Sequence, residues 1–149
     1  MADLVTSITE SVVLNGSVRG STNTLTTTGI NNAYERIVTC THSQATTLVA
    51  FNTNSYGAVV QLDKEDVRYI RVTNLNTTIS VEIAVVGAAT LYQVTLKAGQ
   101  SHILGAADNI MLAEADTTPS YGTMAALQNI SVTPIGTTNV DLEVFVASV

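Results

Sequence analysis

Cysteine is nearly missing from this sequence, which contains a single copy, Cys40, in 149 residues. One cysteine cannot form an intramolecular disulfide, and it cannot supply the several thiolates of a structural zinc site. A chain of this length buries roughly two-thirds of its unfolded surface, so it can fold without such cross-links. We therefore expect a protein that is stabilised by an apolar core and suited to a reducing cytosol.

Positive charge is also scarce. The chain has six Lys and Arg residues against twelve Asp and Glu residues, which gives a net charge of −6. Nucleic-acid binding depends on basic side chains that displace the counterions of phosphates. The basic residues are scattered, and Arg68 and Arg71 are three apart, so on a strand they point to opposite faces. We expect neither nucleic acid nor an anionic membrane as a partner.

A long apolar run is absent as well. The longest uncharged apolar stretch, Ile83 to Ala89, is much shorter than the ~20 residues that a helix needs to cross a bilayer. The start, Met1 to Leu4, has no basic segment followed by an apolar run, so we expect no signal peptide. No segment predicts a helix of three turns; Met124 to Gln128 could form one turn.

Residues that favour strands dominate the chain. Threonine occurs 23 times, valine and isoleucine are plentiful, and such β-branched side chains pack well on a pleated sheet. Apolar and polar residues alternate from end to end, with turn residues between the runs. This pattern predicts one all-β domain over residues 1–149, an antiparallel β-sandwich or barrel of about eight to ten short strands.

Two hairpins are expected from the alternation. The first pairs residues 67–72 with 78–85 across Asn74 to Asn76, and the last pairs 130–134 with 140–146 across Gly136 to Asn139. The residues on the apolar faces predict a core of Ile37, Val49, Val60, Ile70, Val72, Ile79, Val81, Ile83, Val94, Ile103, Ile130, Val132, Leu142 and Val144.

Three segments lie outside this regular pattern. Residues 1–14 have strand character and could be an extended N-terminal arm or the first strand of the sandwich. Ser17 to Asn32 has little apolar content and reads as a loop or a weak edge strand, and Ala113 to Tyr121 reads as a loop. Long loops and free terminal segments often contact partners. We expect partner contacts from six residues: Val5, Ile8, Val12, Leu14, Thr117 and Tyr121.

Few residues are arranged for catalysis or for binding an ion. Cys40 and His42 would share one face of a strand, as a thiolate–imidazole pair requires, but Cys40 also fits a small buried side chain. Ser101 and His102 are adjacent and would point apart.

Two acidic clusters also occur in the chain. Asp63, Glu65 and Asp66 form one and Glu114 and Asp116 the other, and both lack the ordered spacing of a calcium loop. Glycine-rich phosphate loops are absent. We expect no catalytic residue, no cofactor and no metal.

Four stretches are similar to a known group of proteins: Val67 to Asn76, Ile79 to Ile83, Leu96 to Leu104 and Asp141 to Ala147. Together they resemble small β-sandwich virion proteins of tailed bacteriophages, above all the head decoration (cement) proteins, over roughly residues 67–147. The resemblance implies a jelly-roll-like domain without enzymatic activity that docks on a capsid lattice, often as a trimer.

The resemblance also implies a partner and a location. The partner would be the phage major capsid protein or another virion subunit, and the protein would reside in the virion after assembly in the host cytoplasm. One alternative is a tail or fibre module that binds a host receptor or glycan. Another alternative is a small enzyme, and Cys40 and His42 are the only residues in the sequence that support it.

Overall fold

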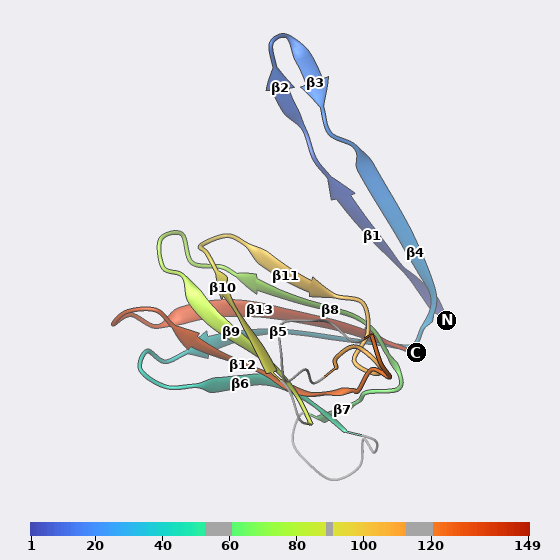
Figure 1. Ribbon diagram of the computed structural model, residues 1–149, viewed down its shortest axis with the longest axis vertical. Helices are drawn as coiled ribbons and strands as arrows, with labels where there is room; N and C mark the ends of the chain where they lie inside the picture. The colour runs from blue at the N-terminus through green and yellow to red at the C-terminus, as the bar shows by residue number, and fades with distance from the viewer. Residues whose placement is uncertain (53–60, 89–90, 113–120) are drawn as a thin grey trace.

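The computed structural model describes residues 1–52, 61–88, 91–112 and 121–149 (Figure 1). Within these residues it contains strands and no helix. The thirteen strands are β1 (Ala2–Thr9), β2 (Val12–Leu14), β3 (Ser17–Arg19), β4 (Thr22–Ile30), β5 (Asn32–Cys40), β6 (Thr46–Asn52), β7 (Gln61–Asp63), β8 (Val67–Asn74), β9 (Val81–Gly87), β10 (Leu91–Leu96), β11 (Ser101–Leu104), β12 (Leu127–Pro134) and β13 (Val140–Ser148).

Two sheets packed face to face form a β-sandwich, which confirms the predicted fold class. One sheet has the order β10-β9-β12-β6-β7 and the other the order β11-β8-β13-β5. Without β7, the eight sandwich strands numbered along the chain have the orders 5-4-7-2 and 6-3-8-1, which is the connectivity of a jelly roll. All of these pairs are antiparallel except β6 with β7, which is parallel.

The core lies between the two sheets and follows the period-2 pattern. In β9, Val81, Ile83 and Val85 are fully buried, and the residues between them are more exposed. In β13 the buried residues include Leu142 and Val144. Because successive side chains of a strand point to opposite faces, this alternation places one face of each sheet against the other sheet.

Most of the expected core is buried, but four of its described residues are not fully buried. The prediction that Ile37 and Ile103 belong to the core is wrong. Their side chains are 61% and 41% exposed, because each lies on the outer face of the β11-β8-β13-β5 sheet. On β5 the inward positions are those of Val38 and Cys40. Ile79 and Val94 are half-buried against the core. Val60 lies outside the described residues.

Both expected hairpins are wrong. β8 pairs with β11 and β13, whereas β9 pairs with β10 and β12, so the chain crosses from one sheet to the other between them. β12 and β13 also belong to different sheets, so the chain crosses between the sheets there as well. Alternation identifies the inward face of a strand, but a strand and its successor can face the core from opposite sheets with the same pattern.

The crossing from β8 to β9 is held by a buried amide. Asn74 is 0% exposed, and its Nδ2 donates hydrogen bonds to the carbonyl oxygens of Ile79 (2.9 Å) and Leu96 (3.2 Å). Its Oδ1 accepts a hydrogen bond from the backbone N–H of Asn76 (3.0 Å). A buried polar side chain with these partners fixes the corner, because any other path would leave the carbonyls unpaired.

The N-terminal strands form a separate ribbon that projects from one end of the sandwich (Figure 1). β1 pairs with β4, β2 pairs with β3, and none of the four joins a sheet of the sandwich. Residues 1–30 are named the arm from here on. Of the two alternatives for Ser17 to Asn32, the loop is wrong and strand structure is confirmed, since β3, β4 and the start of β5 occupy this segment. Met124 to Gln128 forms no helical turn, and β12 begins at Leu127.

Candidate functional site

The arm is a long β-hairpin with a tight turn at its tip. Asn15 and Gly16 have φ angles of 50° and 79°, and Leu14 pairs with Ser17 across them. Positive φ at both central residues is the two-residue turn that Asn-Gly favours. This turn reverses the chain at the tip and joins β2 to β3.

Hydroxyl groups pair across the lower part of the arm. The Oγ of Ser7 and the Oγ1 of Thr24 are 3.0 Å apart, and the Oγ1 atoms of Thr9 and Thr22 are also 3.0 Å apart. Cross-strand pairs of Ser and Thr each stabilise a ribbon by a fraction of a kcal/mol, about 0.2–1. These pairs explain how a threonine-rich segment without a core holds its register.

Gly20 permits a close approach of the two chains where the paired segments of the arm meet. Its φ is +122°, and a Cβ built at this position would overlap the carbonyl oxygen of Glu10. Next to this contact, the backbone N–H of Glu10 donates a hydrogen bond to the carbonyl oxygen of Ser21 (2.9 Å). Only glycine adopts such a backbone without strain and leaves room for the opposing strand.

The arm carries exposed apolar side chains along its whole length. The exposed fraction is 60% for Val5 and 73% for Val18, and between 49% and 67% for the others, namely Ile8, Val12, Val13, Leu14 and Leu25. A two-stranded ribbon is at best marginally stable alone in water, and a run of exposed apolar side chains is typical of an interaction surface. The arm is therefore the part of the described chain best suited to hold a partner.

The base of the arm is fastened to the sandwich. Ile30, the last residue of β4, is buried, and the backbone N–H of Asn31 donates to the carbonyl oxygen of Ser148 (2.9 Å) at the end of β13. Gly29 has a φ of +81°, which a residue with a side chain rarely adopts. This junction fixes the direction in which the arm leaves the sandwich.

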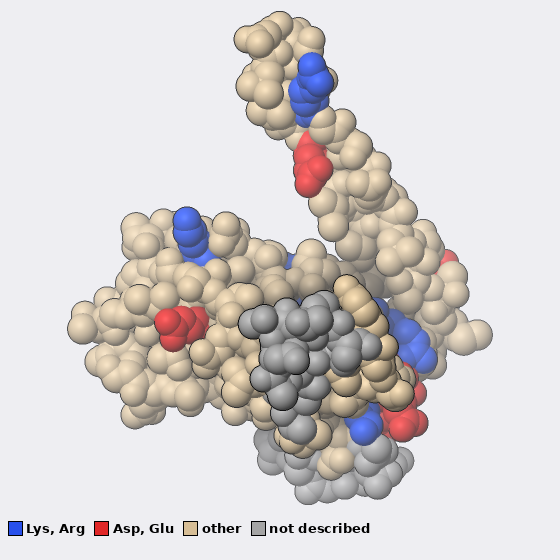
Figure 2. Space-filling view, viewed as in Figure 1, with Lys and Arg blue, Asp and Glu red and all other residues tan. Residues whose placement is uncertain are grey.

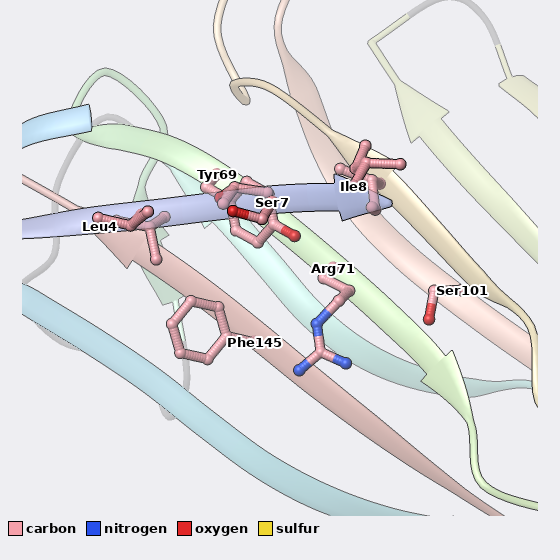
Figure 3. Close-up of a pocket in the computed structure, with 10 residues that line it drawn as sticks. Leu4, Ser7, Ile8, Tyr69, Arg71, Ser101 and Phe145 are labelled. Atoms are coloured by element: carbon pink, nitrogen blue, oxygen red, sulfur yellow. The ribbon is translucent and has the colours of Figure 1, made fainter. Parts of the chain in front are cut away.

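A cleft of about 360 Å³ lies between the arm and the outer face of the β11-β8-β13-β5 sheet (Figure 3). Leu4 and Ile8 of β1 form one wall, and Tyr69 and Phe145 contribute to the other. A second hollow of about 300 Å³ continues toward β4, where Leu25 lines it. Because the arm does not pack tightly on this face, apolar side chains on both walls stay accessible.

On the sheet side of the cleft, Arg71 contacts several neighbouring side chains. Its Nη1 is 2.7 Å from Oε2 of Glu143 and donates a hydrogen bond to Oγ1 of Thr73 (2.6 Å). Its guanidinium carbon lies 6.0 Å from the ring centre of Phe145, and that ring meets Tyr69 edge to face with centres 6.0 Å apart. The partners neutralise the charge of Arg71 and hold its side chain flat on the sheet.

Charge is sparse on the face seen in Figure 2, and most of that surface is neither basic nor acidic. The arm contains only Asp3, Glu10 and Arg19 as charged side chains in its thirty residues. The arm therefore presents mainly backbone hydrogen-bonding groups and apolar side chains, with few charges.

Cys40 and His42 do not form the thiolate–imidazole pair. Burial raises the pKa of the Cys40 thiol to about 11, whereas a nucleophilic cysteine needs a lowered pKa. The thiol points to the carbonyl oxygen of Val38 at 3.9 Å, and Nδ1 of the exposed His42 lies 3.1 Å from Oγ of Ser43. Cys40 thus has the alternative role of a small buried core residue.

Ser101 and His102 point apart, as adjacent strand residues must. Oγ of Ser101 lies 2.8 Å from Oγ1 of Thr73 on the outer face. Nε2 of His102 lies 2.9 Å from the hydroxyl of Tyr92, which belongs to the other sheet. Burial lowers the pKa of His102 and raises that of Tyr92. This pair links β10 with β11 across one lateral edge of the sandwich.

The remaining candidates are spread over the molecule. Oδ1 of Asp63 accepts a hydrogen bond from the backbone N–H of Glu65 (3.1 Å), so this carboxylate caps its own turn. Among the described residues no group of three His, Cys, Asp or Glu side chains is placed to hold a metal ion. Tyr121 is 84% exposed and belongs to no strand. Thr117 and the cluster of Glu114 and Asp116 lie outside the described residues.

The structure places Val5, Ile8, Val12 and Leu14 along the arm, the first two on β1 and the others on β2. The sequence left the segment of β4 between a loop and a weak edge strand, and it did not indicate Leu25, Tyr69 or Phe145 as site residues. The threonine content of residues 22–28 was the available signal, since threonine favours strands even without apolar neighbours.

In the part of the chain that the structure describes, no helix is long and apolar enough to span a membrane. Comparisons of the chain with protein-family models, curated proteins and solved structures find no match.

Proposed function

We propose that this protein is a structural virion protein without enzymatic activity, a decoration protein that binds and stabilises a phage head shell. The observation that carries the proposal is the arm, a β-ribbon whose exposed apolar side chains lack a partner within the described chain. Such a ribbon gains stability when a neighbouring subunit covers its apolar side chains or extends its hydrogen-bonded edge.

The fold and the sequence support the same proposal. Jelly rolls occur in capsid and lectin domains, which is an association and not a physical requirement. The four stretches that resemble decoration proteins include β8, most of β13 and the turn before β11. The partner is the major capsid protein or another virion subunit, and the expected assembly on the shell is a homo-oligomer, with a trimer as the state that the resemblance suggests.

The experiment is co-sedimentation with empty heads of the phage that encodes the chain. The wild-type protein is expected to pellet with the heads and to saturate at a fixed ratio to the capsid subunits. A variant with Val12, Val13 and Leu14 replaced by serine should stay folded, since all three are exposed, and should bind more weakly. A wild-type protein that ignores heads but binds host cells or polysaccharide would contradict the proposal.

A further inference from the structure

At one lateral edge of the sandwich β5 and β6 lie opposite each other, and the described residues add no further strand to β5 or to the first half of β6. β5 has nine residues and pairs only with β13 among the described strands. β7 pairs with β6 only at Ala50 to Asn52, so residues 46–49 of β6 have β12 as their one described neighbour. Within the described part of the chain, both sheets therefore present backbone N–H and C=O groups at this edge, and natural proteins usually cover such groups.

A cleft of about 340 Å³ separates these two free strand edges. Arg36 and Val38 of β5 line one side, and residues 46–50 of β6 line the other, among them the buried Leu48 and Val49. Strand edges with unpaired backbone groups next to apolar residues are an arrangement that accepts an added strand. This feature is named the edge slot.

Arg36 gives the edge slot a preference for a negatively charged strand. Its side chain is exposed, and the ion pair found in the described structure, between Arg71 and Glu143, does not involve it. A cation at the mouth of an apolar slot disfavours a neutral apolar strand and favours a strand that carries a carboxylate.

The arm has the matching features. β1 and β4 have eight and nine residues, and each has one free edge because they pair only with each other. Asp3 lies within β1 and Glu10 directly follows it, and both are exposed. In its own subunit, residues of β1 and β4 lie over the outer face of β8, β11 and β13, and no arm residue lines the edge slot.

We propose that the arm of one copy adds as a strand to the edge slot of a second copy, with the carboxylate of Asp3 or Glu10 beside Arg36. This inference rests on the proposed function, because it names a second copy of the chain as the partner of the arm. The exchange converts free strand edges of two subunits into one continuous sheet, and it covers the apolar side chains of the arm. Repeated around an axis, it links the subunits of a ring.

The test is a charge exchange in the full-length chain, read by sedimentation velocity over a concentration series. Arg36→Glu alone, and Asp3→Lys with Glu10→Lys, each place like charges together and should raise the dissociation constant about tenfold or more. The triple variant restores opposite charges and should return within about threefold of the wild type. If the effects of the substitutions on the dissociation constant are not additive in this way, Arg36 and the arm carboxylates interact directly across the interface.

The matched control is Lys97→Glu, which changes the net charge by as much as Arg36→Glu but lies on the exposed turn between β10 and β11. It should leave the dissociation constant within about twofold, and all variants should keep the wild-type thermal midpoint. A wild type that stays monomeric, or a triple variant that associates no better than its parents, overturns the inference.

The same proteins distinguish the inference from the proposed function. If the protein binds heads but its self-association does not respond to the charge exchange, the proposed function stands and the arm exchange is refuted. If its self-association follows the charge exchange but it does not bind heads, the arm exchange stands and the decoration function is refuted.

Discussion

Replacing Ile83 with alanine tests the arrangement of the core against the sequence pattern. Ile83 is 0% exposed in β9, and removing three carbons from a buried isoleucine costs about 2–5 kcal/mol through lost burial and the cavity left behind. Ile37 shares the alternating pattern but lies on the outer face of the sheet. Ile37→Ala should therefore cost less than about 1 kcal/mol.

Urea denaturation at low protein concentration measures both changes. A loss of about 3 kcal/mol is a large share of a typical stability of about 5–15 kcal/mol, and should lower the thermal midpoint by about 5–15 °C. The slope of the free energy with urea should be the same in both variants, so that the midpoints report stability alone. Equal losses for Ile83→Ala and Ile37→Ala would refute the placement of β5 and β9.

Three further predictions concern buried polar groups. Asn74→Ala should cost about 1–3 kcal/mol in urea denaturation, because it leaves the carbonyls of Ile79 and Leu96 unpaired. Since burial lowers the pKa of His102 below its ordinary value of 6.5, the unfolded chain binds the proton more readily. Stability should thus fall as the pH drops below 6.5, and His102→Gln should remove that part of the pH dependence of the thermal midpoint. Cys40, with a pKa raised to about 11, should resist a thiol reagent at pH 8 until the protein is unfolded; fast labelling of the folded chain would contradict its burial.

The strand pattern predicted the fold class because alternation is a local consequence of burying one face of a sheet. Ile70, Val72, Ile83 and Leu142 are buried as expected. The same pattern could not assign strands to sheets, since β8 and β9 would alternate in the same way whether paired with each other or stacked in opposite layers. Asn74 stabilises the crossing between the two sheets, and part of its role depends on the carbonyl of Leu96, which is 22 residues away in sequence.

The arm was predictable only in part. Strand character in residues 1–14, followed by a segment with little apolar content, indicated a segment that could leave the sandwich. The sequence left β4 between a loop and a weak edge strand, because its polar, threonine-rich stretch lacks the apolar alternation from which strands were identified. The edge slot could not have been found either, because it depends on which strand lies opposite β5.

Hydrogen exchange of the backbone amides, with and without phage heads, tests most directly whether the arm is the assembly element. In the free protein, amides of β1 to β4 should exchange much faster than those of β9 and β13, because the ribbon has no core. On heads, protection should rise by at least about tenfold at the arm amides, where a new subunit covers them. Arm amides that exchange equally fast on heads, with new protection confined to other surfaces of the sandwich, would contradict the role assigned to the arm.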